Sequence, residues 1–484
     1  MMIFVPIVKG SPAIVLFLFV LLIIFNLPLK AGDNSYGNAQ DTSRLIVIHS
    51  ITIDGNLRTR HSIILRELPF HELDTIRQTP FRQMLIAGKE NIFNTALFNF
   101  VILDTVSLGG SPVQIDLVIH VLERWYVWPW PFFEISDRNF NTWVETTDFS
   151  RLSYGIDLTI QNVRGRNETL KFPVHYGFNQ KFGFSYRIPY LDRKKIVGIA
   201  FGAEYSRNHE VIVETHNNKT VYYKNPDHFP RQNLYAFTEL LLRPTFYVRH
   251  TFRVGFNSWF FSDSLLKIPG YTANSSHDLN YFSIYYQYKN DHRDVQFYPL
   301  KGSYFDVELD QNGLLFSPVN EFFIKSNLRE YMQIHNRWYF ALGFTLKVTL
   351  TPQPPYFLQR GLGYGRDFVR GYEYYVIDGR NFILWKNNLK LALVPQRDFS
   401  MDFIRSPKFN RVPYALYLNL FSDVGYVWYD GDQTDKSNDL RNSLLVGYGA
   451  GLDLTTYYDI VISLEVSMNR KGIPGIYLHF MAPI

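Results

Sequence analysis

The residue with the clearest capacity for specific chemistry is an arginine in a long loop. Residues 361–380 read GLGYGRDFVRGYEYYVIDGR and lie between two apolar, alternating segments. A loop of this length is usually functional or disordered, and its aromatic residues argue against disorder. Arg370 is followed by Gly371, which lets the backbone turn beside a guanidinium, and by Tyr372. We interpret the stretch as a loop that folds into the lumen of a membrane β-barrel, with Arg370 as its anchor. Three further charges of the loop are expected to be solvated: Arg366, Asp378 and Arg380.

Other kinds of reactive site find little support in the sequence. The 13 histidines are scattered with no pair at metal-ligand spacing, so neither a metal site nor a cofactor is predicted. Serine, histidine and aspartate are abundant, but no nucleophile motif appears, and no enzymatic activity is predicted. The absence of cysteine excludes thiolate chemistry, a disulfide scaffold and a lipidated cysteine. The net charge of +5 includes no dense basic cluster, which argues against a nucleic-acid partner.

The first 31 residues have the pattern of a targeting segment. An almost wholly apolar run from Pro12 to Pro28 is followed by a polar spacer. The alternative is a permanent membrane anchor, because the run is only slightly shorter than a spanning helix. The small residues at its end favour a cleaved secretory signal, with cleavage after Ala31 or Ala39. Residues 32–44 then form a linker.

Residues 45–125 predict one small α/β domain. The pattern indicates a strand from Leu45 to Ile53, a helix capped by Thr59 that runs through Leu68, and a second helix at about 81–97. Two strands follow, and the turn sequence GGSP separates them. They are expected at 100–106 and 113–122.

The rest of the chain, residues 126–484, alternates with period two. In 460–469, for example, isoleucine, leucine, valine and methionine share one face, while the other face is mostly polar. A soluble sandwich would alternate too. Glycine, serine and charges on one face, with tryptophan and tyrosine near the strand ends of the other, favour a membrane barrel. By the same alternation Asp423 faces the lumen. The aromatic stretch 125–132 is interpreted as a hinge at the membrane interface or a latch onto the preceding domain.

Sixteen antiparallel strands can be placed, which is an even number and lets the first strand pair with the last. The strands are expected near 132–140, 151–162, 168–179, 181–190, 195–206, 234–249, 251–262, 281–290, 302–310, 323–334, 338–350, 381–394, 414–428, 442–455, 460–469 and 476–482. Long polar connections then fall on the outer face and short ones on the inner face, as in outer-membrane barrels. The connection 395–413 is the exception, since it is long and would lie inside.

Four segments of this region resemble motifs of the BamA, TamA and FhaC superfamily of outer-membrane insertases and translocases. They are FVRGY at Phe368–Tyr372, FSDVG at Phe421–Gly425, the segment Asp291–Gly302 and the glycine-rich Gly447–Asp453. Each motif alone is a weak signal, but the order and spacing of all four agree with a sixteen-stranded barrel. Residues 45–125 resemble a single POTRA domain, through Ile51–Asn56, the Glu67-Leu68 helix end and Val121–Glu123; a generic α+β module is the alternative. The resemblance implies that Arg370 pairs with Asp423. The sequence departs from the family pattern in two places. The usual glutamate is missing at 387–390, and the chain continues beyond Phe480 where the family often ends on an aromatic residue.

The resemblance implies an outer-membrane insertase whose POTRA domain lies in the periplasm. Unfolded outer-membrane or secreted proteins would be its clients, outer-membrane lipid its surroundings, and accessory lipoproteins possible partners. An exposed strand would bind clients by β-augmentation, and we assign Phe100, Val101, Ile102 and Leu103 to it. Glycine and proline weaken strand pairing, so a lateral seam is expected near Gly472, Pro474, Gly475 and Phe480. The alternatives are a two-partner-type secretion translocase and a passive channel.

Overall fold

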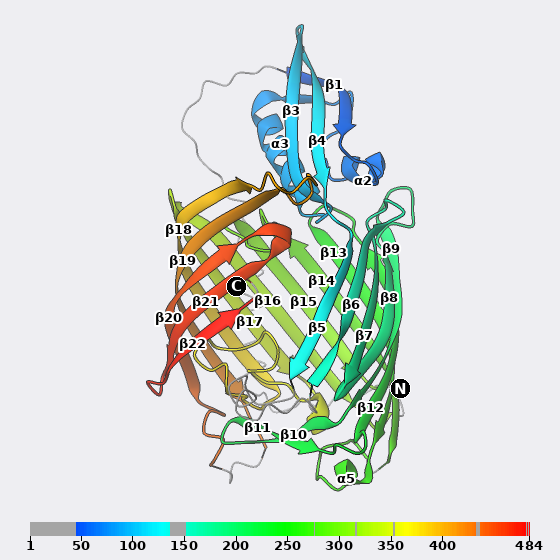
Figure 1. Ribbon diagram of the computed structural model, residues 1–484, viewed down its shortest axis with the longest axis vertical. Coiled ribbons are helices and arrows are strands. Elements are labelled where there is room, and N and C mark those ends of the chain that lie inside the picture. Colours follow the sequence, from blue (N-terminus) through cyan, green and yellow to red (C-terminus); the bar gives the residue numbers. More distant parts are fainter. Residues whose placement is uncertain are drawn as a thin grey trace, which may run out of the picture.

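The protein folds into a small α/β domain placed over one end of a 16-stranded antiparallel barrel (Figure 1). The computed structural model describes residues 45–135, 152–274, 276–314, 317–351, 354–431, 436–480, 482 and 484. The predicted signal segment, residues 1–31, and the linker 32–44 lie outside the described residues. In the described part of the chain, no helix combines the length and apolar character needed to cross a membrane.

The N-terminal domain is a four-stranded sheet in the order β2-β1-β4-β3 with two helices packed against it. Its elements are β1 Leu45–Asp54, α2 His61–Leu65, β2 Thr75–Arg77, α3 Gln78–Phe93, β3 Phe98–Gly109 and β4 Val113–Glu123. Strand β1 runs parallel to β4, and β3 pairs only with β4, so β3 forms one edge of the sheet. The predicted order of two helices and three strands is present, with the short β2 added.

The predicted helix cap at Thr59 is wrong. Helix α2 begins at His61 and has no side-chain cap. Thr59 instead donates to the Glu123 carboxylate from its backbone nitrogen, at 2.6 Å, and from its hydroxyl, at 2.7 Å. Glu123 is buried at the end of β4. A buried carboxylate needs such donors, and satisfying it decides the conformation of Thr59.

The barrel strands follow the predicted alternation closely, and each pairs with its sequence neighbours except where the β10–β11 hairpin intervenes between β9 and β12. They are β5 Val127–Ile135, β6 Leu152–Val163, β7 Glu168–Gly177, β8 Asn179–Ile188, β9 Val197–Asn208, β12 Arg231–Leu242, β13 Val248–Phe261, β14 Asp278–Asp291, β15 Gly302–Asn312, β16 Glu321–His335, β17 Trp338–Thr349, β18 Asn381–Ser400, β19 Arg411–Trp428, β20 Leu444–Thr455, β21 Val461–Asn469 and β22 Pro474–His479. In β19 the odd-numbered side chains from Ala415 to Val427 are buried and the even-numbered ones face outward.

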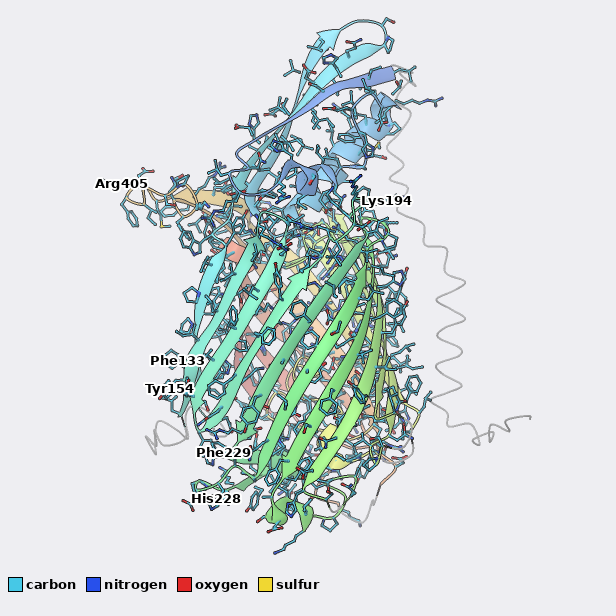
Figure 2. The ribbon with its side chains drawn as sticks, turned by 90° about the vertical axis from the view of Figure 1, so that its right-hand side faces the viewer. Phe133, Tyr154, Lys194, His228, Phe229 and Arg405 are labelled. Atoms are coloured by element: carbon cyan, nitrogen blue, oxygen red, sulfur yellow. The ribbon has the colours of Figure 1, made fainter. Side chains whose placement is uncertain are left out.

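Two connections differ from the expectation. The stretch 125–132 is not a hinge, because β5 begins at Val127 and pairs with β6. The latch alternative holds for Tyr126 alone, which packs into the core of the N-terminal domain and donates to the Leu97 carbonyl oxygen at 3.0 Å. Residues 395–413 are not a long inner loop, because β18 and β19 extend into them and leave 401–410 as the connection. Figure 2 shows Arg405 at the tip of this hairpin, which projects sideways from the barrel near the N-terminal domain.

The outer connections contain secondary structure that the alternation of side chains did not predict. A separate hairpin, β10 Glu210–His216 with β11 Lys219–Lys224, and the short helix α5 Asp263–Leu266 lie at the end of the barrel opposite the N-terminal domain (Figure 1). Short 3-10 turns occur at η2 Tyr356–Leu358 and η3 Tyr457–Asp459. An apolar cluster joins β10, α5 and η2 through Val211, Leu265 and Phe357. Outer loops therefore pack together over this opening.

Ion pairs hold the N-terminal domain against the barrel. The buried Glu67 accepts from Arg243, between β12 and β13, at 2.6 and 2.7 Å. Arg124 donates to Asp459 of η3 at 2.6 and 2.8 Å. One pair involves the segment after α2 and the other the segment after β4. Together these bidentate pairs fix the orientation of the N-terminal domain and its distance from the barrel.

Candidate functional site

Arg370 lies at the centre of a polar cluster on the lumen wall. Its side chain is 1% exposed, and Asp423 of β19 is fully buried. The guanidinium donates from Nε to Asp423 Oδ2 at 2.8 Å and from Nη2 to Oδ1 at 2.6 Å, while the Arg370 backbone nitrogen donates to Oδ2 at 3.1 Å. Such a bidentate pair sets the position of the loop in addition to neutralising both charges. The contact that the resemblance implied is therefore present.

Three further groups surround the guanidinium. Asn388 of β18, buried, accepts from Arg370 Nη2 at 2.7 Å. The ring of Phe421 lies 3.9 Å from the guanidinium carbon, in cation–π geometry. Glu465 of β21 places its Oε1 3.5 Å from Nη1. Asn388 stands in the segment where the family's usual glutamate is missing, and its amide oxygen takes one guanidinium donor.

The loop reaches the wall because glycines leave space for its backbone. A Cβ at Gly447 of β20 would lie 1.7 Å from the Arg370 carbonyl oxygen. Gly371 has a φ of +90°, in the left-handed region that favours glycine. Its carbonyl oxygen accepts from Asn469 of β21 at 3.0 Å. Tyr372, also buried, accepts through its hydroxyl from the Arg470 backbone nitrogen at 3.3 Å. Residues 369–372 are thus tied to β19, β20 and β21.

The remaining loop charges differ from the expectation in two cases. Asp378 is not solvated, because it is 3% exposed and accepts from three groups. The donors are Thr215 of β10, Tyr364 and Arg441. Arg380 also has a partner, Asp430 in the next outer loop, and its side chain is 13% exposed. Arg366 is exposed, as expected. The outer half of the loop is therefore tied to neighbouring outer loops by buried charge.

The predicted seam lies between β22 and β5, which form the two ends of the sheet. Among the described residues no ladder joins these two strands, so the expected pairing of first and last strands is wrong for this structure. Strand β22 is short: Pro474 pairs with Met468 and Gly475 with Ser467, while Gly472 has a φ of +73° in the preceding turn.

The end of the chain leaves the wall. The last strand was expected to run to 482, but β22 ends at His479, and Phe480 is 69% exposed. Ile484 packs against Tyr331 and Ala341, on the lumen faces of β16 and β17. Ala482 and Ile484, the two described residues beyond Phe480, therefore pack against the lumen wall instead of extending the seam strand.

The opposite side of the seam carries two prolines. Pro129 and Pro131 lie within β5, which keeps an unbroken register with β6 across both of them. A proline is accepted in a strand where its missing N–H faces an unpaired edge. The free edge of β5 therefore lacks two hydrogen-bond donors. At the periplasmic end the seam is held by side chains, since the ring of Trp128 packs edge-on against Tyr458 of η3 at 4.5 Å.

The four residues assigned to the client-binding edge lie on β3, the outer strand of the N-terminal sheet. Val101 is buried in the domain core, Leu103 packs against it, and Ile102 is 49% exposed. The β18–β19 hairpin covers the beginning of the strand, because Arg411 lies over the Phe100 ring at 4.5 Å. The rest of β3 remains accessible.

Comparison with known proteins identifies both parts of the chain. Residues 162–457 match the model of the Omp85 superfamily domain, which covers more than half of the chain. The chain belongs to the Omp85 superfamily. Residues 46–124 match the POTRA model, described as a surface antigen variable number repeat. Members of this superfamily are outer-membrane insertases and translocases that act on protein clients without being enzymes. The chain is thus an outer-membrane protein of this class, with its POTRA domain in the periplasm.

One solved structure supports the barrel fold, and two further matches have lower scores. BamA from Haemophilus ducreyi, lacking POTRA domains 1–3, matches with a TM-score of 0.50 and 16% identity over 90% of this chain and 83% of that chain. CdiB from Escherichia coli gives a TM-score of 0.49 and 12% identity, covering 90% and 75%. CdiB from Acinetobacter baumannii gives a TM-score of 0.45 and 14% identity, covering 88% of this chain and 70% of that chain. Among curated protein sequences none matches the chain.

Proposed function

We propose that this Omp85 protein inserts client proteins into the outer membrane through the seam between β5 and β22. The missing ladder between these strands is the observation that carries the proposal. An unpaired strand edge within lipid is costly, because its backbone groups have no water to bind. A client strand that pairs with this edge would satisfy those groups. The two prolines of β5 and the short β22 keep the barrel from closing the edge by itself.

The POTRA domain would receive the client first, through the edge of β3. The initial residues of β3 are covered by the β18–β19 hairpin, so we assign the binding edge to Ile102 through Leu108. Ile102, Val106 and Leu108 are each about half exposed. An extended peptide would pair with this edge through its backbone and place apolar side chains against these residues.

The anchored loop would keep the lumen closed while the seam works. The loop is tied to the wall by Arg370 and to the outer hairpin β10–β11 by Asp378. The POTRA domain contacts the turns at the opposite opening. Contacts at both ends argue against a steady open pore and favour lateral insertion over passive conduction.

Photo-crosslinking during client assembly tests the proposal. A crosslinker at Ile476 of β22 reports on the seam, and one at Asn327, which is buried on the lumen side of β16, reports on the lumen. We expect an outer-membrane client to be captured from Ile476 and not from Asn327. Capture from Asn327 alone would instead establish a secretion translocase. Capture from neither position, together with stable conductance in a planar bilayer, would favour a channel.

A further inference from the structure

Glu373, Glu465 and His479 come together beside the seam although they are far apart in the sequence. Glu373 belongs to the anchored loop, Glu465 to β21 and His479 to the last strand, β22. One ligand atom from each residue lies within 4.8 Å of the other two. His479 Nε2 is 3.5 Å from Glu465 Oε2 and 3.8 Å from Glu373 Oε1.

These three atoms are buried and have no hydrogen-bond partner. Glu465 in particular is fully buried. The second oxygen of each carboxylate is already engaged: Glu373 Oε2 accepts from the Gly371 backbone nitrogen at 2.8 Å, and Glu465 Oε1 faces Ser463 and Arg370. The free oxygens are therefore held close to one another and to the imidazole, and the Tyr477 side chain also faces the Glu373 carboxylate. A buried carboxylate oxygen without a donor is costly, which indicates that the cluster is completed by another group.

A protonated histidine alone completes the cluster poorly. Both nitrogen–oxygen separations exceed the range of a hydrogen bond. Arg370 Nη1 lies 3.5 Å from Glu465 Oε1, on the far side of that carboxylate from the imidazole contact, while its Nε and Nη2 hold Asp423. The oxygens that face the imidazole, Glu465 Oε2 and Glu373 Oε1, would share a single positive charge. The nearby Lys386 is engaged with another group, because its ammonium lies over the ring of Phe368 at 4.4 Å. A doubly charged cation would neutralise both carboxylates.

We propose that Glu373, Glu465 and His479 bind a first-row divalent metal ion, with Zn²⁺ as the most suitable probe. Two ligands at about 2.1 Å from a tetrahedral zinc lie roughly 3.4 Å apart, close to the separations found here. One imidazole and two carboxylates are a donor set that suits zinc. A cavity of about 90 Å³ borders Glu465 and His479 and leaves room for water as a further ligand.

The site would connect the seam side of the barrel, at β22, to the wall that holds the Arg370 loop. The ion would join β22 to the loop that Arg370 holds against β19, so metal binding would limit the movement of the last strand. The sequence could not reveal this cluster by spacing, because its members are 92 and 14 residues apart along the chain. Binding of the ion does not depend on the proposed insertase function.

Zinc titration of the full-length, untagged protein in detergent, after dialysis against a chelator, tests the site. We expect one Zn²⁺ per chain, with Glu373→Gln and His479→Gln each weakening binding by more than the roughly 10- to 100-fold lost with a supporting residue. His175→Gln is the matched control, because His175 pairs with Asp157 alone on β6 and β7, and it should bind zinc like the wild type. Heat-modifiable migration in gels checks that each variant is folded.

The proposal would be overturned if zinc binding did not saturate at one equivalent per chain. It would also be overturned if folded His479→Gln and Glu373→Gln bound zinc as tightly as the wild type. Co²⁺ absorption of the wild-type protein needs no variant. Intense four- or five-coordinate bands that Zn²⁺ displaces would support the site, whereas the weak spectrum of hydrated Co²⁺ would overturn it.

Discussion

The wall formed by β18–β21 and the seam between β5 and β22 represent opposite ways of building the same barrel. At the wall, the Arg370 loop is fixed by a bidentate ion pair, by Asn388 and by a glycine that allows backbone contact. At the seam, two prolines and a short last strand leave the strand edges unpaired. The wall is held by side-chain contacts in addition to its strand pairing, whereas the seam lacks even the strand pairing.

The difference teaches how a membrane barrel can open at one position only. Strand edges in lipid are expensive, so a barrel with a weak seam needs the rest of its wall to hold its register. The buried charges of the loop provide that restraint next to the seam, since Arg370 contacts residues on β18, β19 and β21. The predictions below separate the two regions.

Breaking the anchor should have the largest effect. Asp423→Ala leaves the buried guanidinium of Arg370 without its counter-charge and should lower the free energy of unfolding by about 3–5 kcal/mol. Arg366→Ala, which removes an exposed charge from the same loop, should change it by less than about 0.5 kcal/mol. Urea unfolding followed by tryptophan fluorescence compares them. Equal effects of both substitutions would show that the anchor does not restrain the wall.

Closing the space for the loop should have a smaller effect. Gly447→Ala places a methyl group 1.7 Å from the Arg370 carbonyl oxygen, so the loop must move away from β20. We expect a loss of about 1–3 kcal/mol, as for other overpacked sites. Faster trypsin cleavage at Arg366 should accompany it, while cleavage at Arg405 on the distant hairpin serves as the internal control. An unchanged rate at Arg366 would contradict the close contact.

Repairing the seam should stabilise the barrel and impair its function. Pro129→Val together with Pro131→Val restores two donors to the free edge of β5, each worth about 0.5–1.5 kcal/mol if β22 pairs with it. We expect slower amide exchange in β22 and reduced client assembly. Pro413→Val, in the β18–β19 hairpin, is the control. If exchange in β22 does not slow, the prolines do not keep the seam open.

The smallest effect concerns the junction of the POTRA domain with the barrel. Burial, and then the nearby charge of Asp294, raises the pKa of Glu90 to about 7, while Lys89 and Lys301 oppose this. Tyr247 also faces Glu90. The raised pKa favours docking below the ordinary pKa of a glutamate, and the benefit is lost as the pH rises through 7. Protease protection of α3 should therefore fall as the pH rises from the ordinary pKa of a glutamate to about 7 in the wild type and level off above that, but it should not change in Glu90→Gln.

The alternation of side chains predicted the sixteen strands and the inward direction of Asp423, because a strand repeats every two residues whatever its partners. It did not predict that 127–132 forms a strand, since proline is accepted at an unpaired edge and the position of that edge is a property of the whole barrel. The hairpin β10–β11 could have been predicted from the pair Asn217-Asn218 at its turn. These residues have φ values of 52° and 56°, and asparagine favours such turns.

The candidate site was predictable only in part for a related reason. The motifs implied the pair of Arg370 and Asp423, but the burial of Asp378 depends on donors from three separate segments. Glu465 and His479 likewise approach Glu373 only through the closure of the barrel and the path of the loop. Contacts of this kind follow from tertiary structure and leave no local pattern.

A reversible lock on the seam tests the account most directly. The chain contains no cysteine, so Phe133→Cys in β5 and Ile476→Cys in β22, both at exposed apolar positions, introduce the only two thiols, and an oxidant can join them in a disulfide when the two strand edges meet. Client assembly in membrane vesicles is then measured with the pair oxidised and reduced. The account predicts that assembly stops in the oxidised protein and returns on reduction. Equal assembly in both states would contradict insertion through the seam.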